Sequence, residues 1–241
     1  MEQTAKRYPE LDSLRGAAVL AMIAYHVCFD LSFYYGYDVG INTGLSVFFA
    51  RATASLFLML TGICFVISYE RTVLTERMMK YAKRAGIVLG GGMIVTLVTW
   101  LLDPATFVVF GILHLMGTAI LLQYLVRPLR RWNIILGALV CATAFLVPNG
   151  TVSTSLLLPL GIMNKGFMSV DYYPLLPWFG PIVIGMGIGD LFYIPKRSAS
   201  LSFFDTFRWP PWLLWIGKKS LLIYFIHQPI VLLLLWLLLG R

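Results

Sequence analysis

The sequence is poor in charge and in cysteine, and each shortage excludes a class of protein. Only 12% of its 241 residues are charged, whereas 59% are hydrophobic. A soluble domain is usually about 45–50% apolar and roughly 25% charged. The composition therefore excludes an ordinary soluble domain and predicts an integral membrane protein. The cysteines, Cys28, Cys64 and Cys141, are odd in number and lack CxxC spacing, which argues against a disulfide framework and predicts buried thiols.

Three further features are missing. The basic residues do not form a single patch, so the net charge of +8 does not indicate nucleic-acid binding. The first apolar run is not followed by a small-residue cleavage site, so we expect it to be a retained helix and not a removed signal peptide. An internal repeat is not apparent, which argues against an inverted-repeat transporter.

Long apolar runs dominate what remains. A spanning helix needs about 20 mostly apolar residues. Seven runs qualify, at 11–32, 45–69, 84–102, 107–126, 132–148, 174–194 and 213–239. The sixth is rich in proline and glycine and is expected to be kinked, and Pro229 is expected to bend the seventh. The sequence predicts an all-α, polytopic membrane bundle of about seven transmembrane helices, forming a single domain over residues 1–241.

Positive charge alternates between the loops of this bundle. Cytoplasmic loops carry an excess of Lys and Arg. The basic residues are Lys6 and Arg7, then Arg71, Arg77, Lys80, Lys83 and Arg84, then Arg127, Arg130 and Arg131, then Lys196, Arg197 and Arg208, with Lys218 and Lys219 at the start of the last run. The other loops carry little positive charge. This pattern predicts a cytoplasmic N-terminus and a C-terminus outside.

The first apolar run carries polar side chains along one face. At 100° per residue, the eleven steps from Arg15 to His26 return to within about 20° of the same direction, roughly 16 Å further along the helix axis. Asp12 and Asp30 lie near that face, one turn before Arg15 and one turn after His26. The predicted orientation places Arg15 near the cytoplasmic surface and His26 toward the outer leaflet.

Each of these side chains has a functional and a structural interpretation. Ionisable residues inside a membrane usually face the bundle and have a function, so His26 is the first candidate for a catalytic base, against a satisfied structural histidine. Asp30 is a second candidate, against a solvated interface group. Arg15 is a candidate for binding an anionic cofactor, or it reaches the lipid headgroups.

Two more histidines lie in apolar runs. His114 is predicted at a depth close to that of His26, which makes it a second catalytic candidate, against a histidine bonded to nearby backbone. His227 precedes Gln228 and Pro229 and is expected near mid-membrane. It is a candidate for lining a cofactor path, or for binding the carbonyl that Pro229 leaves free.

The outer side carries candidates for binding a substrate. Asp171 begins the stretch DYYPLLPWFG, which also holds Tyr172 and Trp178. A carboxylate beside aromatic rings suits a sugar, although an aromatic interface belt has the same composition. An unpaired Arg51 within the membrane would be costly, so it is expected to pair with Asp30 or Asp171, or to contact substrate.

Several stretches together resemble a known family. DSLRG followed by His26 resembles the arginine–histidine pattern of membrane acyltransferases that act on extracytoplasmic sugars. The chain is similar to the bacterial relatives of the heparan-alpha-glucosaminide N-acetyltransferase catalytic domain, the DUF1624 family. The resemblance extends over nearly the whole chain and rests on ARATASLFLMLTGICFVIS at 50–68, FGILHLMGTAILL at 110–122, DYYPLLPWFGPIVIGMGIGD at 171–190 and WIGKKSLLIYFIHQPIV at 215–231.

This resemblance implies a transmembrane acetyltransferase of the bacterial cytoplasmic membrane. It implies acetyl-CoA as the co-substrate, held from the cytoplasmic side, and an extracytoplasmic amino sugar or glycan as the acceptor. It also implies pairing into a homodimer, and no metal is expected. Lys83 and Arg84 become candidates for the phosphates of coenzyme A, against ordinary basic loop residues. The thioester would reach His26, acting as a base or as a nucleophile.

Two alternatives from other classes remain open. A bis-histidine haem protein could use His26 and His114 as axial ligands. A small transporter for a glycolipid or an anion would also place polar residues inside a helical bundle.

Overall fold

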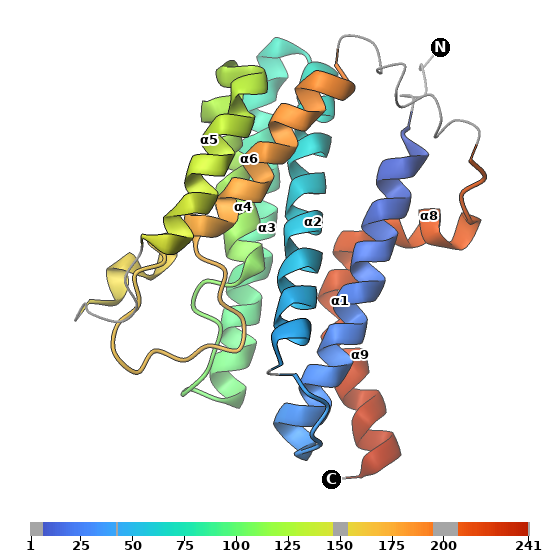
Figure 1. Cartoon of the computed structure of the whole chain (residues 1–241), viewed down its shortest axis with the longest axis vertical. Coiled ribbons are helices and arrows are strands. Elements are labelled where there is room, and N and C mark those ends of the chain that lie inside the picture. Colours follow the sequence, from blue (N-terminus) through green and yellow to red (C-terminus); the bar gives the residue numbers. More distant parts are fainter. Residues whose placement is uncertain (1–6, 42, 147–153, 195–206, 241) are drawn as a thin grey trace. The chain divides into compact units, whose positions relative to one another are not determined.

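The structure is a computed structural model that describes residues 7–41, 43–146, 154–194 and 207–240 (Figure 1). These residues form α-helices joined by loops and short 3-10 turns, which confirms the predicted all-α class. The α-helices are α1 (Pro9–Tyr35), α2 (Gly44–Glu70), α3 (Leu74–Leu102), α4 (Ile112–Val126), α5 (Asn133–Ala142), α6 (Leu175–Phe192), α8 (Pro211–Lys218) and α9 (Ser220–Leu239). Lys6, Lys196 and Arg197, three of the residues used to predict orientation, lie outside the described ranges.

Six helical stretches of the described chain are long and apolar enough to cross a membrane. They are Pro9–Tyr35, Gly44–Glu70, Leu74–Leu102, Ile112–Phe145, Leu175–Phe192 and Ser220–Leu239. All seven predicted apolar runs contain helix. The fourth and fifth runs count as one stretch by length, although α4 and α5 are separated by the 3-10 turn η1 (Arg127–Trp132), in which Arg130 leaves the helical region at φ 48° and ψ −126°. The chain is a multi-pass membrane protein.

The largest difference from the predicted bounds is at the start of α3. α3 begins at Leu74, well before the predicted start at residue 84, so Arg77, Lys80 and Lys83 lie on the helix and not in a loop. The segment is rich in Glu, Arg, Lys, Met and Ala, which favour helix without being apolar. Hydropathy finds only the part of a helix that lies in hydrocarbon, so it misses such extensions.

The last apolar run is also divided. It forms the short helix α8 and the longer helix α9, with Lys219 between them outside the helical region. Pro229 lies inside α9, which continues on both sides of it. In α6 the predicted irregularity lies at the start, where Leu176 has non-helical φ and ψ of −100° and 122°.

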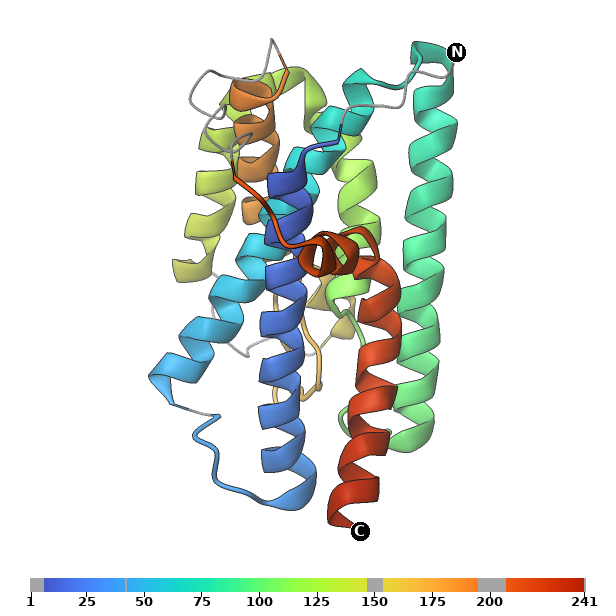
Figure 2. The ribbon, with the colours of Figure 1, turned by 90° about the vertical axis from the view of Figure 1, so that its right-hand side faces the viewer.

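The described chain divides into two compact units. The first comprises residues 1–60 and 199–241, and the second residues 61–198. In the first unit α1 packs against both α8 and α9, and α8 crosses α1 before the chain turns into α9 (Figure 2). The crossing depends on small residues, because a Cβ on Gly16 would collide with the Leu213 carbonyl and one on Gly217 with the Asp12 carbonyl.

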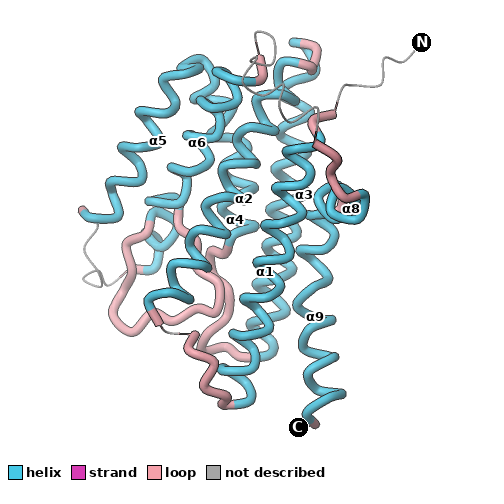
Figure 3. The backbone as a smooth tube through the Cα atoms, turned by 45° about the vertical axis from the view of Figure 1, so that its right-hand side comes forward, coloured by secondary structure: helices cyan, strands magenta, loops and turns pink. Residues whose placement is uncertain are grey.

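The second unit pairs α3 with α4 and α5 with α6. Gly137 and Gly180 let α5 and α6 approach closely, since a Cβ on Gly137 would lie 2.7 Å from the Gly180 carbonyl oxygen. The loops before α4 and α6 run together at one end (Figure 3), where the Val170 amide donates to the Thr106 carbonyl at 2.9 Å. The loops at this end of the unit are therefore held together by backbone hydrogen bonds as well as by helix packing.

Candidate active site

Two histidines meet in the first unit. His26 of α1 and His227 of α9 lie edge to face, with ring centroids 4.8 Å apart and planes at 83°. His227 is buried and His26 is partly buried. The sequence predicted a function for both residues but gave no reason for them to touch. Their contact follows from α1 and α9 packing side by side in the same direction (Figure 1).

The helix backbone sets the proton positions on both rings. Nδ1 of His26 lies 2.9 Å from the Met22 carbonyl oxygen, and Nδ1 of His227 lies 2.6 Å from the Tyr224 carbonyl oxygen. A carbonyl oxygen only accepts hydrogen bonds, so Nδ1 carries the hydrogen in each neutral imidazole. Nε2 of each ring is then the nitrogen with a free lone pair. The pair therefore presents two bases of the same tautomer.

A buried carboxyl lies one turn beyond His26. Asp30 is completely buried, and both of its carboxyl oxygens accept from the Gln228 side-chain amide, at 2.8 and 2.9 Å. Gln228 directly follows His227, so this bond fixes the position of α9 against α1 beside the histidines. Asp30 is thus held by an amide and not by Arg51, the partner expected from the sequence.

Arg15 lies at the other end of the same helix face. Its guanidinium forms an ion pair with Asp12 at 3.6 Å and a long contact of 3.5 Å with the Ser220 hydroxyl. Ser220 is the first residue of α9, so Arg15 lies where α8 turns into α9. We call the six side chains that follow this helix pair the polar seam: Arg15, His26, Asp30, Ser220, His227 and Gln228. Arg15 and His26 are separated along the seam by about 16 Å of helix axis.

His114 lies in the second unit and has a bonding partner on each ring nitrogen. The Gly111 amide donates to Nδ1 at 3.3 Å, and Nε2 lies 3.4 Å from the Thr96 hydroxyl, which itself donates to the Val108 carbonyl. His114 therefore closes the first turn of α4 and joins it to α3. These are the bonds of the structural alternative that the sequence left open.

Of the predicted outer residues, Asp171 and Tyr172 belong to the joined loops of the second unit and Trp178 lies in the first turn of α6. Asp171 accepts from the Ile112 amide at 3.1 Å, at the start of α4, and Tyr172 donates its hydroxyl to the Leu158 carbonyl at 2.7 Å. Burial raises the pKa of the Asp171 carboxyl to about 6, and burial raises the pKa of Tyr172 to about 12. Trp178 packs against Tyr173 with ring centroids 4.7 Å apart.

The remaining predicted residues are exposed. Lys83 and Arg84 lie on α3, and Arg51 lies on α2. Asp30 and Asp171, the two partners expected for Arg51, are bonded by Gln228 and by the Ile112 amide respectively. The structure therefore gives no support to the expected pairing of Arg51 with either carboxylate.

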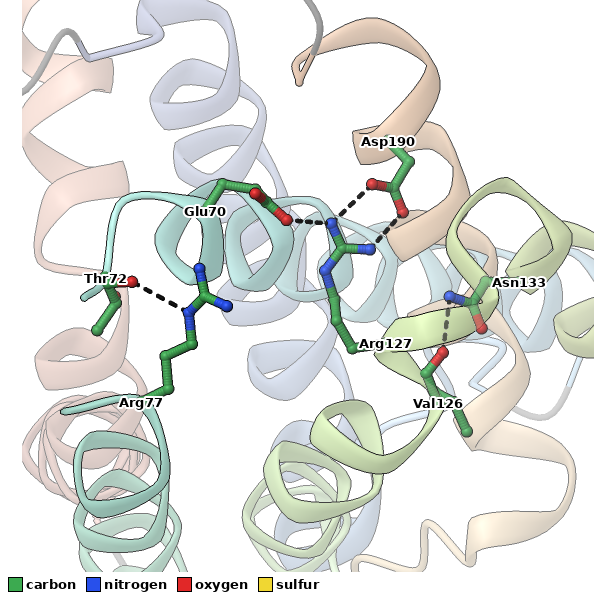
Figure 4. A network of polar contacts seen from close by, with 7 residues as sticks. All are labelled: Glu70, Thr72, Arg77, Val126, Arg127, Asn133 and Asp190. Atoms are coloured by element: carbon green, nitrogen blue, oxygen red, sulfur yellow. Dashed lines mark hydrogen bonds and ion pairs between the residues drawn. The ribbon is translucent and has the colours of Figure 1, made fainter. Parts of the chain in front are cut away.

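One buried ionic group was not predicted. Arg127, which the sequence placed in a basic loop, is buried and binds both oxygens of Asp190 at 2.8 Å and Glu70 at 2.6 Å (Figure 4). Glu70 and Asp190 lie at or near the C-terminal ends of α2 and α6. Carboxylates are unfavourable at helix C-termini, so their position was a signal that a cation lies between them.

Comparison with known proteins assigns the chain to a family. The family model described as heparan-alpha-glucosaminide N-acetyltransferase, catalytic, matches residues 7–229. No curated protein and no solved structure gives a significant match. The matched range contains every residue of the polar seam, and it confirms the resemblance seen in the sequence. The chain therefore belongs to the heparan-alpha-glucosaminide N-acetyltransferase catalytic family, a family of membrane-bound N-acetyltransferases.

Proposed function

We propose that this protein transfers the acetyl group of cytoplasmic acetyl-CoA to an extracytoplasmic amino sugar or sugar hydroxyl. The observation that carries the proposal is the His26–His227 pair, two imidazoles in contact inside the helix pair that holds the polar seam. Polar groups inside a membrane bundle are costly unless they are used. Family membership favours an amine as the acceptor. We place the protein in the bacterial cytoplasmic membrane, as a homodimer.

The seam suits a long, extended cofactor. In the proposed arrangement the phosphates of coenzyme A lie near Arg15 at the cytoplasmic side. Exposed Lys83 and Arg84 on α3 are the alternative position for these phosphates. The pantetheine arm follows the face of α1, and the thioester reaches His26 about 16 Å further along the axis. A guanidinium suits phosphate because its planar donors bind two oxygens at once. His227 would line the end of this path.

The chemistry begins at Nε2 of His26. With its Nδ1 hydrogen held by the Met22 carbonyl, a neutral ring can accept a proton from the attacking amine or hydroxyl at Nε2. The acceptor attacks the thioester carbonyl, and coenzyme A leaves toward the cytoplasm. In the second route His26 is the nucleophile and carries the acetyl group briefly. Incubation with labelled acetyl-CoA and no acceptor separates these routes, because only the second leaves label on the protein.

The acceptor would bind at the predicted outer surface. Trp178 and Tyr173 form an aromatic pair on which the apolar face of a sugar could pack. Asp171 and Tyr172 already bond to the backbone, so we propose that they hold the loops before α4 and α6 in shape while contacting the acceptor with their remaining lone pairs. Asp30, which accepts both hydrogen bonds from Gln228, would position the histidines and stabilise a proton on them. Arg51 remains a candidate for an acceptor contact.

The bonding of His114 bears on the two alternatives. Both of its ring nitrogens are engaged, so it does not have a free nitrogen for haem, and we propose a structural role for it at the start of α4. A transporter would also use a polar seam, but it would not need two bases of the same tautomer.

A proteoliposome assay tests the proposal. Vesicles are loaded with acetyl-labelled acetyl-CoA inside, and glucosamine is added outside. We expect labelled N-acetylglucosamine outside, with coenzyme A retained inside. His26→Asn should insert normally and abolish transfer, because Asn keeps a donor near the Nδ1 position but lacks the base. Labelled acetyl-CoA appearing outside, or transfer by His26→Asn at the rate of the unmodified protein, would contradict the proposal.

A further inference from the structure

The buried base that the proposed reaction does not yet use is His227. Its Nε2 atom is buried and has no hydrogen-bond partner within the described part of the chain. The ring is fixed by its Nδ1 bond to Tyr224, and Nε2 is the nitrogen that can accept a proton. A buried polar atom without a partner is unfavourable, so its presence beside His26 points to a ligand that supplies the missing hydrogen.

The chemistry of an amine acceptor supplies that hydrogen. An amino group on a sugar is largely a protonated ammonium at pH values below its own pKa. The ammonium nitrogen has no lone pair, so it must lose one proton before it attacks the thioester. It must lose a second proton after attack, when the new carbon–nitrogen bond places a positive charge on nitrogen. A hydroxyl acceptor has only one proton to lose.

We propose that His26 and His227 are two catalytic bases that divide these two protons between them. The inference rests on the proposed function. Nε2 of His227 takes the first proton from the ammonium. The free amine then attacks the thioester carbon, and Nε2 of His26 takes the second proton from the tetrahedral intermediate. The carbon–sulfur bond breaks with its electron pair on sulfur, and the thiolate receives the proton from His26.

The products balance. One ammonium and one acetyl-CoA give one amide, one thiol form of coenzyme A and one proton, which leaves His227 for solvent. His26 is assigned to the second proton because it shares a helix face with Arg15, along which the thioester would lie, and its proton must pass to sulfur. His227 is on the other helix. The ring centroids lie 4.8 Å apart, so the two bases belong to one site.

The surroundings of His227 contain few other titratable groups. From α1 it faces His26, with Tyr25 against the His26 ring and Asp30 bonded through Gln228. From α9 itself Tyr224 packs against the His227 ring at a centroid distance of 5.5 Å. Arg15 lies further along the seam, beside Ser220. The His227→Asn substitution below leaves all of these groups in place.

The test compares His227→Asn with His26→Asn over a range of pH, using glucosamine and acetyl-CoA. Asn at 227 keeps a donor for the Tyr224 carbonyl but has no base. Only the uncharged fraction of the amine can then react, and this fraction falls about tenfold for each pH unit below the amine pKa. The ratio of the His227→Asn rate to the rate of the unmodified protein should fall by the same factor for each pH unit below the amine pKa. Above that pKa the ratio should return toward one. His26→Asn should stay inactive throughout.

Hydroxylamine, a weakly basic amine that is mostly uncharged at neutral pH, gives the matched control. His227→Asn should use it at nearly the rate of the unmodified protein, whereas His26→Asn should not. A defect of His227→Asn that is the same at every pH and for both acceptors would overturn the inference. Recovery of the rate of His26→Asn at high pH or with hydroxylamine, without recovery of His227→Asn, would overturn it as well. Failure of the unmodified protein to acetylate any amine would also overturn the inference, whereas failure with both amines and sugar hydroxyls would contradict the proposed function.

Discussion

Gln228 donates its side-chain amide to both carboxyl oxygens of Asp30, at 2.8 and 2.9 Å, and so joins α9 to α1 beside the two histidines. No other donor to Asp30 is seen in the described ranges. Asp30 is completely buried, and a buried polar group that loses its partner costs about 1–3 kcal/mol, and more if it is charged. The bond is therefore expected to contribute to stability as well as to the spacing of His26 and His227.

Gln228→Leu should lower the free energy of unfolding by about 1–3 kcal/mol or more, because it leaves Asp30 buried without a donor. The double variant Asp30→Leu with Gln228→Leu removes both partners and should recover most of that loss, since replacing both by apolar groups is often nearly neutral. Unfolding in detergent micelles measures both. A double variant as unstable as the single one would show that the bond is not the source of the effect.

Arg127 should be among the most sensitive positions for stability. Arg127→Met leaves Glu70 and Asp190 facing each other without the cation, and breaking a buried ion pair by removing one partner costs about 3–5 kcal/mol. Arg131→Met is the matched control, because Arg131 is exposed and lies over the Trp132 ring. The yield of folded protein and its melting temperature in detergent should fall sharply for the first variant and little for the second. Equal effects would contradict the assignment.

Asp171 should make stability depend on pH. Burial raises the pKa of its carboxyl from 3.8 to about 6, so between these values the folded protein holds a proton that the unfolded chain has lost. The contribution is fully present below about pH 4 and is lost as the pH rises through 6, with a size of at most about 3 kcal/mol.

Asp171→Asn removes this dependence while keeping an acceptor for the Ile112 amide. The melting temperature of the unmodified protein relative to Asp171→Asn should therefore fall between pH 4 and 7. A constant difference over this range would show that Asp171 titrates normally.

The sequence predicted the helical class and the approximate apolar runs, and it singled out the histidines of the candidate site, because each follows from residue type and helical spacing. The contact between His26 and His227 could not be predicted, since no local pattern says which two of several apolar helices pack together. The division of the last run at Lys219 was missed for a similar reason. It depends on α8 crossing α1 at Gly16 and Gly217, a tertiary contact between distant segments.

Two charged residues show opposite errors. Arg127 looks like a loop residue when positive charge alone is counted, yet it is buried between carboxylates from two other helices. Arg51 looks like a residue that must find a partner in the membrane, yet it is exposed on α2, and the carboxylates expected to bind it are bonded elsewhere. Hydropathy gives the approximate depth of a charge but not the direction in which its side chain points.

Arg15 gives the most direct test of where the cofactor begins. Arg15→Gln should raise the KM for acetyl-CoA by about tenfold or more with a smaller change in kcat, because a hydrogen bond to a charged group contributes about 1.5–3 kcal/mol. Ser220→Ala removes the neighbouring hydroxyl and should have a weaker effect of the same kind. Lys83→Gln and Arg84→Gln test the alternative position for the phosphates, since both side chains are basic and exposed on α3.

The pattern across these variants decides between two positions for the phosphates. A change in KM confined to Arg15→Gln places them at the turn between α8 and α9, which is the start of the polar seam. A change confined to the α3 variants places them on the second unit, and the thioester would then need another route to His26. Equal, small changes in all variants would show that the phosphates are held by neither group, and the seam would lose its proposed role as the cofactor path.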